Sequence, residues 1–188
     1  MLRIIGGAWR GRRFRFPAGA AEIRPTPDRV RETLFNWLGP RVVGARCLDL
    51  FAGSGALGLE ALSRGAASVV FVERDAVAAR ELQARLAEWN AKDAEVMRGD
   101  ALGFLNGVGL SFDVVFLDPP FDANLLPVAA KRLEEQGWLA PDALIYIESP
   151  GRSDLPSLPL SWQQAKAKRA GEVGYHLYQR GVRGGAAI

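Results

Sequence analysis

The residues best suited to binding a ligand lie at positions 49–58, in the stretch DLFAGSGALG. Gly53, Gly55 and Gly58 form the pattern G-x-G-x-x-G there, directly after an apolar run. Such glycines let the backbone pass close to a ligand, and the helix that follows points its first amides at negative charge. Nicotinamide dinucleotides and S-adenosylmethionine fit this motif equally well, so the choice between them depends on residues farther along the chain.

Acidic residues downstream of the glycines favour one of these cofactors. Glu73 ends the second apolar run, 20 positions after Gly53, where a carboxylate can accept hydrogen bonds from both ribose hydroxyls. Asp100 ends the third run, where its carboxylate can accept a hydrogen bond from an adenine amino group. A nicotinamide enzyme normally also needs a proton donor or acceptor near the hydride, and the only histidine, His176, lies near the C-terminus. We therefore predict S-adenosylmethionine as the cofactor.

The fourth apolar run ends in Asp118-Pro119-Pro120-Phe121, whose chemistry suits an amino group on a planar base. Such an amine is a poor nucleophile because its lone pair is delocalised into the ring. The Asp118 carboxylate and the Pro119 carbonyl can both accept N–H bonds, which aims the lone pair of the nitrogen at an electrophile. The prolines stiffen the loop, and Phe121 can stack on the base. We therefore predict methyl transfer to this amine, with no metal and no covalent enzyme intermediate.

An alternation of strands and helices must position these residues. A hairpin at residues 2–16 comes first, and Thr26 is predicted to N-cap the next helix, with Pro27 at its first position. Several later strands are continuous apolar runs, as expected when both faces of a sheet are covered. The pattern predicts an α/β fold, a Rossmann-like doubly wound and mainly parallel sheet with an antiparallel C-terminal strand pair. The strands are predicted at residues 46–51, 68–73, 94–100, 112–118 and 143–149, and the helices at 56–65, 75–90, 101–107 and 123–136.

Composition and charge narrow the class of protein. The chain has 188 residues, of which 48% are hydrophobic, and no apolar stretch approaches the roughly 20 residues of a membrane span. The N-terminus carries no secretion signal, and the single Cys47 excludes an intramolecular disulfide. We therefore expect a cytoplasmic protein with no membrane partner, and we expect Cys47 to be a core residue.

The net charge of +3 is unevenly distributed. Residues 1–31 hold eight arginines against two acidic residues, residues 162–188 carry a net charge of +4, and residues 32–161 carry −7. Arginine binds phosphate well because its planar fork donates two hydrogen bonds at once. The interleaving of the N-terminal arginines with Trp9 and Phe14 favours nucleic acid as the partner. For Arg29 and Arg31, a role in helix solvation and salt bridges explains the charge as well as RNA contact does.

The order of these motifs is similar to that of class I S-adenosylmethionine-dependent methyltransferases that modify amino groups of nucleobases. More closely, the sequence resembles the RsmD family, which makes N2-methylguanine in 16S ribosomal RNA. The resemblance spans residues 3 to about 180. It is carried by RIIGGAWRGRRF, RPTPDRVRETLFNWL, LDLFAGSGALGLEALSRGA, LDPPF and KRAGEVGYHLYQR.

The resemblance implies roles for individual positions. The methionine end of the cofactor falls to Asp49 and the glycine loop, the ribose to Glu73 and the adenine to Asp100. The full cofactor set is Asp49, Ala52, Gly53, Ser54, Gly55, Glu73, Arg74, Asp100 and Ala101. The target guanine falls to Asp118, Pro119, Pro120 and Phe121, and the RNA-facing residues are Arg10, Arg12, Arg13, Arg24 and Thr26.

The resemblance also implies a division of the chain and a substrate. Residues 1–40 form a basic RNA-facing extension and residues 41–188 the methyltransferase domain; the alternative is that the hairpin only covers one flank of the sheet. The expected substrate is 16S ribosomal RNA, free or within the small ribosomal subunit, and the enzyme is expected to be a monomer. Two other functions stay open from the residues: a DNA adenine-N6 methyltransferase and a non-catalytic RNA-binding module.

Overall fold

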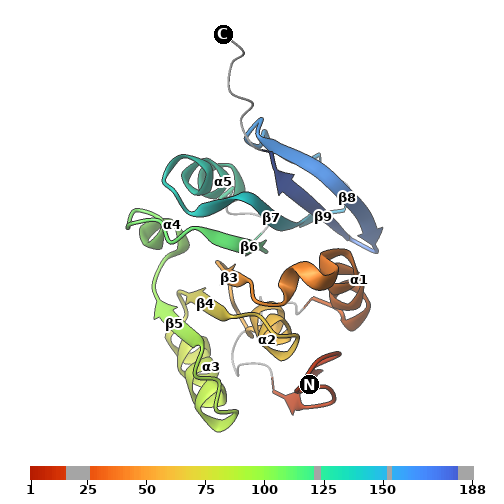
Figure 1. The fold of residues 1–188 in the computed structure, drawn as a ribbon, viewed down its shortest axis with the longest axis vertical. Helices are drawn as coiled ribbons and strands as arrows, with labels where there is room; N and C mark the ends of the chain where they lie inside the picture. The colour runs from red at the N-terminus through yellow and green to blue at the C-terminus, as the bar shows by residue number, and fades with distance from the viewer. Residues whose placement is uncertain (16–25, 121–123, 152–153, 182–188) are drawn as a thin grey trace.

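The computed structural model describes residues 1–15, 26–120, 124–151 and 154–181. Two predicted site residues, Arg24 and Phe121, lie outside these ranges. A seven-stranded sheet forms the centre of the molecule, in the order β5-β4-β3-β6-β7-β9-β8 (Figure 1). The strands are β3 (Arg46–Asp49), β4 (Ser68–Glu73), β5 (Ala94–Arg98), β6 (Phe112–Leu117), β7 (Leu139–Pro150), β8 (Trp162–Ala170) and β9 (Val173–Arg180).

The predicted mainly parallel sheet with an antiparallel end is confirmed. Strands β3 to β7 pair in parallel, whereas β9 pairs antiparallel with both β7 and β8. Strand β9 therefore lies between β7 and β8, and the last strand pair extends the sheet rather than forming a separate unit. His176 is part of this strand pair, opposite Ile147.

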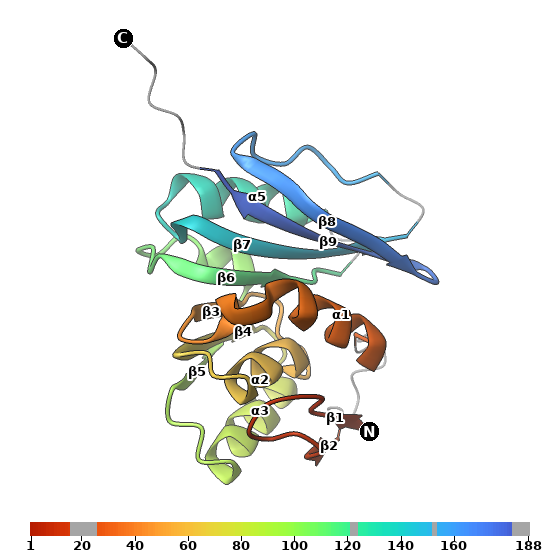
Figure 2. The same ribbon diagram turned by 45° about the vertical axis from the view of Figure 1, so that its right-hand side comes forward.

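Helices cover both faces of the sheet, which explains the continuous apolar strands. One face packs against α1 (Asp28–Leu38), α2 (Ala56–Ser63) and α3 (Ala76–Glu88) through one hydrophobic cluster. The other face packs against α4 (Ala101–Phe104) and α5 (Leu126–Glu135) through a second cluster. Figures 1 and 2 show this three-layer arrangement, with α5 and α1 on opposite sides of the sheet. Cys47 is fully buried in the first cluster, as predicted.

The start of one helix agrees with the sequence prediction and the start of another does not. Asp75 caps α3 by accepting hydrogen bonds from the backbone N–H groups of Val77 and Ala78. The predicted N-cap role of Thr26 is wrong, because α1 begins at Asp28 with no side-chain cap. The Thr26 hydroxyl donates to Glu148 instead, so the local capping bond is replaced by a contact with a distant strand.

The N-terminal hairpin packs onto α2. Its strands, β1 (Leu2–Arg3) and β2 (Arg13–Phe14), pair antiparallel as predicted. The fully buried Glu60 of α2 accepts the backbone N–H groups of Ile5 and Gly6. A short 3-10 helix, η1 (Gly39–Val42), follows α1 at the proposed domain boundary.

A buried ion pair joins the hairpin, α1 and α2. Arg31 of α1 is fully buried and contacts Glu60 at 3.4 Å and Asp28 at the start of its own helix. Its guanidinium also donates to the backbone carbonyl of Arg3 in the hairpin. Since removing one partner of a buried pair leaves an uncompensated charge, this contact ties the first 40 residues to the body of the fold. This buried contact crosses the predicted domain boundary at residue 40.

Candidate active site

The predicted site residues gather where the strand order reverses. The chain runs outward from β3 to β4 and β5, then returns to place β6 on the other side of β3. In open α/β sheets the crevice at this switch point, beyond the carboxyl ends of the strands, is where ligands bind. Asp49 is the last residue of β3 and Asp118 follows the last residue of β6, so both carboxylates lie at the carboxyl ends of the two strands that flank the switch point.

Strand register places the acidic side chains on one face of the sheet. Asp49 is paired with Phe116, and Phe116 with Tyr146. Because side chains alternate along a strand, residues two positions later point to the same face. Asp118 and Glu148 therefore share the face of Asp49, which is the face covered by α1 and α2.

The glycine loop has a conformation that larger residues would disturb. Gly53 and Gly55 have φ angles of 53° and 77°, in the left-handed region that favours glycine. A side chain at Gly55 would also meet Leu82 of α3 at 2.6 Å. The third glycine, Gly58, lets α2 pack on β4, because a Cβ there would meet Phe71 at 2.2 Å.

The carboxylates of Glu73 and Asp49 accept backbone N–H groups of the glycine motif. Glu73 accepts the backbone N–H of Gly53 at 2.7 Å with one oxygen and that of Asp75 at 2.7 Å with the other. Asp49 accepts the N–H of Gly58 at 3.0 Å. Each oxygen of Glu73 keeps a second lone pair, so the residue can still accept hydrogen bonds from a diol.

The remaining predicted cofactor residues line the ends of β4 and β5. Asp100 is exposed and caps α4 by accepting the N–H of Gly103 at 2.8 Å. Ala101 is buried as the first residue of that helix, whereas Arg74 is exposed after Glu73. In the loop, Ala52 and Ser54 are buried, and the Ser54 carbonyl accepts a hydrogen bond from Arg85. The structure thus brings the whole predicted cofactor set to one edge of the sheet.

Four carboxylates, those of Asp49, Glu73, Asp118 and Glu148, cluster toward the carboxyl ends of β3, β4, β6 and β7. Burial raises the pKa of Asp49 to about 7, and the nearby charge of Glu73 adds to the rise. Burial also raises the pKa of Asp118 well above its usual range, with the charges of Glu148 and Asp49 as further causes. Among the described residues, no Lys or Arg forms an ion pair with any of these four carboxylates.

Sequence reasoning missed Glu148. It is only 4% exposed, and its Oε1 accepts the hydroxyls of Thr26 at 2.7 Å and Tyr146 at 2.9 Å. Its burial raises its pKa, although these two hydrogen bonds oppose the rise. Glu148 lies near the end of the apolar run IYIES, two residues before Pro150, but it belongs to none of the motifs used to choose site residues; its buried place next to Asp118 marks it.

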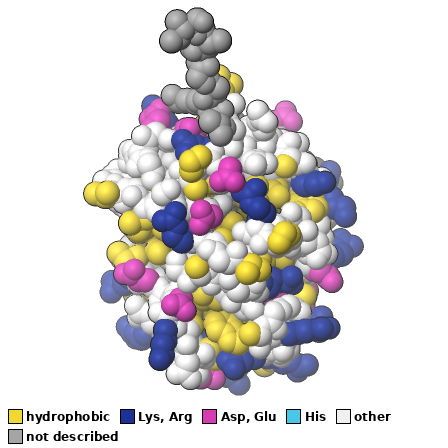
Figure 3. All heavy atoms as spheres, in the orientation of Figure 1, with side chains coloured by type: hydrophobic (Ala, Val, Ile, Leu, Met, Phe, Trp, Pro, Cys, Tyr) yellow, Lys and Arg dark blue, Asp and Glu magenta, His cyan; other side chains and the backbone are white. Residues whose placement is uncertain are grey.

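The predicted RNA-facing residues lie in two settings. Arg10, Arg12 and Arg13 are exposed on the hairpin, and the Arg12 guanidinium lies over the rings of Trp9 and Trp89. Thr26 is buried and committed to Glu148, so it does not present its hydroxyl on the surface. Figure 3 shows Lys and Arg side chains along the right-hand edge of the molecule, where Figure 1 places the hairpin and the β8–β9 turn.

The hairpin is connected to the glycine loop through one residue. Arg85 of α3 donates to the carbonyl of Ser54 and to the carbonyl of Arg15, the last described residue of the hairpin. Thr26, the next described residue of the chain, contacts Glu148. Arg15 and Thr26 thus contact, respectively, the side of the site with the glycine loop and the side with β7.

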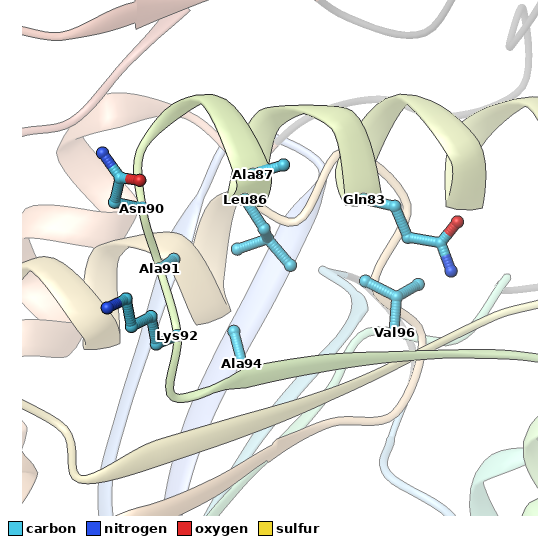
Figure 4. A pocket seen from close by; sticks show the side chains of 8 residues that line it. All are labelled: Gln83, Leu86, Ala87, Asn90, Ala91, Lys92, Ala94 and Val96. Carbon is cyan, nitrogen blue, oxygen red and sulfur yellow. The ribbon is translucent and has the colours of Figure 1, made fainter.

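A separate hollow of about 320 Å³ lies between α3 and β5 (Figure 4). Its lining includes Leu86, Asn90 and Ala94, the last of which begins β5. Because the predicted site lies at the carboxyl ends of the strands, this hollow is at the opposite end of β5 and does not belong to it.

The site fits S-adenosylmethionine on two structural grounds. The methionine end of that molecule carries a sulfonium and an ammonium, and Asp49, which is buried and forms no ion pair among the described residues, supplies a compensating charge when it is ionised. The glycine loop offers a close backbone approach, with Glu73 beside it as a diol acceptor. The fold and the site together define a class I S-adenosylmethionine-dependent methyltransferase.

Comparison with known proteins identifies the family. The model of the family described as "Conserved hypothetical protein 95" matches residues 2–179. Ribosomal RNA small subunit methyltransferase D of Escherichia coli K12 is 50% identical, over 97% of this chain and 92% of that protein. The protein of the same name from Haemophilus influenzae is 48% identical, over 95% and 93%. A solved structure, a putative methyltransferase yhhF from Escherichia coli, superposes with a TM-score of 0.89 at 49% identity, covering 97% and 99%.

The chain therefore belongs to the RsmD family of methyltransferases, as the sequence resemblance predicts. The non-catalytic module is excluded, because relatives that are about half identical over nearly the whole chain are named as methyltransferases. Among the described residues, no helix has the length and apolar character needed to cross a membrane.

Proposed function

We propose that this methyltransferase transfers a methyl group from S-adenosylmethionine to the exocyclic N2 of a guanine in 16S ribosomal RNA. The observation that carries the proposal is the position of Asp118, beside the glycine loop and at the head of the D-P-P-F segment. Relatives at 50% and 48% identity are named as methyltransferases of the small-subunit ribosomal RNA, which favours RNA over the DNA adenine alternative.

The chain's own residues contribute position and charge. Asp118 and the Pro119 carbonyl accept the N–H bonds of the amine and aim its lone pair at the methyl group. The bound cofactor supplies that methyl on a sulfonium, which carries the driving force of the transfer. Once methylated, the nitrogen becomes a strong acid, and Asp118 or water can take its proton. The base must be unpaired or flipped, because a Watson–Crick pair occupies N2.

The basic hairpin is proposed to hold the RNA backbone. Arg10, Arg12 and Arg13 are exposed, and Arg24 follows in the chain toward Thr26. Because Arg85 connects the end of the hairpin to the glycine loop, RNA bound by these arginines would lie close to the crevice. We also propose that the enzyme acts as a monomer in the cytoplasm, on RNA that is free or within the small subunit.

Mass spectrometry of nucleosides from 16S RNA tests the proposed function. RNA from cells that lack the gene should lose one N2-methylguanine and regain it when the purified enzyme and S-adenosylmethionine are added. Parallel reactions with free 16S RNA and with assembled small subunits identify the preferred substrate. A product in genomic DNA, or methyladenine in place of methylguanine, would overturn the proposal.

A further inference from the structure

The carboxylate of Glu148 is held by one oxygen only. Both of its hydrogen bonds, from Thr26 and from Tyr146, end on Oε1. Its Oε2 has no hydrogen-bond partner among the described residues, and this atom keeps some surface accessible to solvent. The side chain is therefore fixed by two donors while its second oxygen stays open as an acceptor.

That open oxygen lies next to the residue proposed to hold the target amine. Leu117 of β6 is paired with Ile147 of β7, and the next residues along the two strands are Asp118 and Glu148. Neighbouring strands are about 4.8 Å apart, and the two side chains point to the same face. Their closeness is reflected in the pKa of Asp118, which the charge of Glu148 helps to raise.

Two adjacent acceptors match one nucleobase edge. Guanine presents two neighbouring donors on its Watson–Crick edge, the N1–H and the N2 amine, and a flipped base is read through that edge. Adenine presents an acceptor at N1 beside its N6 amine, which would face a carboxylate oxygen with no proton between them. A carboxylate next to Asp118 thus accepts from guanine and repels adenine.

From this juxtaposition we infer that Glu148 is a specificity-determining residue, whose Oε2 accepts the N1–H of the target guanine while Asp118 holds N2. The inference rests on the proposed function and deepens it. Thr26 and Tyr146 then act as positioning residues, because they orient the carboxylate without touching the base. The buried hydroxyl of Thr26 has a role here that differs from the RNA contact predicted for it.

Glu148→Gln tests the inference with little change in shape. The amide oxygen can still accept from Thr26 and Tyr146, which leaves the amide N–H₂, a donor, at the open position. The substrate is RNA with guanine or 2-aminopurine at the mapped target position. 2-Aminopurine keeps the amine but has an unprotonated N1 that accepts a hydrogen bond.

We expect the wild-type enzyme to prefer guanine to 2-aminopurine. Glu148→Gln should lower kcat/KM on guanine by about 10- to 100-fold and reduce the guanine preference by at least as much, because a charge-assisted acceptor is replaced by a donor. Affinity for S-adenosylhomocysteine and the melting temperature serve as controls for folding. Glu134→Gln removes another buried carboxylate, one that accepts from Trp162 and Arg180, and should leave the guanine preference unchanged.

Two different failures can be told apart. An unchanged guanine preference in Glu148→Gln, whether both activities fall equally or neither falls, would overturn the inference alone. Equal losses would assign Glu148 a structural role. Methyladenine as the product of the wild-type enzyme would overturn the proposed function and this inference together.

Discussion

The two halves of the active site use their carboxylates differently. On the cofactor side, Glu73 and Asp49 accept backbone N–H groups and so shape the glycine loop. On the target side, Asp118 accepts no hydrogen bond from the described residues, and Glu148 keeps one oxygen open. The cofactor half is thus organised by the fold itself, whereas the target half has acceptors that a substrate must satisfy. Mutations should therefore affect binding on one side and turnover on the other.

The largest effect is expected on the target side. Asp118→Ala should lower the single-turnover methylation rate by about 100- to 1,000-fold, because it removes the group that orients the amine in the transition state. Affinity for S-adenosylhomocysteine, measured by calorimetry, should stay close to that of the wild type. Methylation at nearly the wild-type rate would show that Asp118 has no role in the mechanism. A loss of S-adenosylhomocysteine affinity as large as the loss of rate would contradict the division into a cofactor half and a target half.

A smaller effect is expected on the cofactor side. Glu73→Ala should weaken S-adenosylhomocysteine binding by about 10- to 100-fold, because the ribose loses charge-assisted acceptors and Gly53 loses the partner of its N–H. Saturating S-adenosylmethionine should restore much of the turnover, unlike in the Asp118 variant. Glu73→Gln keeps one acceptor oxygen and should give an intermediate affinity. Unchanged affinity in both variants would mean that the ribose is held by other residues.

The raised pKa of Asp49 predicts a pH dependence of cofactor binding. With a pKa of about 7 in the free enzyme, Asp49 is mostly protonated at pH 6 and ionised at pH 8. If the cationic end of the cofactor needs the ionised form, affinity for S-adenosylmethionine should rise about tenfold over this range. Asp49→Asn should flatten the dependence. An equally steep profile in that variant would assign the titration to another group.

The same shift has the opposite sign for stability. The pKa of Asp49 is higher in the folded than in the unfolded protein, so its burial costs stability once the unfolded carboxyl ionises. This cost is absent below pH 3.8 and grows until the pH exceeds about 7. Bound cofactor should offset it, so the increase in melting temperature caused by S-adenosylmethionine should be larger at pH 8 than at pH 6.

The smallest effect is expected on the hairpin surface. Arg10→Ala should flatten the slope of log affinity for RNA against log salt by about 0.7–0.9, since each phosphate contact contributes about that amount. Cofactor affinity and melting temperature should not change, because Arg10 is exposed and forms no ion pair among the described residues. An unaltered slope would place the RNA elsewhere, for instance along the basic strand β8.

Counting charges along the sequence predicts the role of some N-terminal arginines but not of others. The sequence predicts a basic N-terminal surface, and Arg10, Arg12 and Arg13 are indeed exposed. Two other arginines of the same region serve the fold instead. Arg3 pairs with Asp28, and Arg31 is fully buried against Glu60, 29 positions away. Asp28 lies three positions before Arg31 on the same helix, so helical spacing could indicate that pair. The contacts of Arg31 with Glu60 and of Arg3 with Asp28 join residues 29 and 25 positions apart, and only packing brings them together.

Strand ends that are followed by glycine, proline or an acidic residue could be predicted from the sequence alone. Each such end carries its own geometry: Gly53 and Gly55 need a left-handed backbone, Asp75 caps the helix it precedes, and apolar runs of five or six residues require a buried parallel sheet. Period-two alternation also places Asp49 and Asp118 once their strands are adjacent. These features depend mostly on the identity of neighbouring residues, so sequence alone indicated the fold class and brought attention to the glycine loop. The hydrogen bond from Gly53 to Glu73, 20 positions away, needs the two strands to be adjacent.

The contact between Thr26 and Glu148 was decided only by the tertiary structure. The two residues are 122 positions apart, and neither has a sequence environment that predicts the other. Local rules assign Thr26 to the cap of a helix and Glu148 to the end of an apolar strand. Glu148 does lie near the end of strand β7, but the cap assignment of Thr26 is overridden, because a buried carboxylate must find donors wherever the fold supplies them.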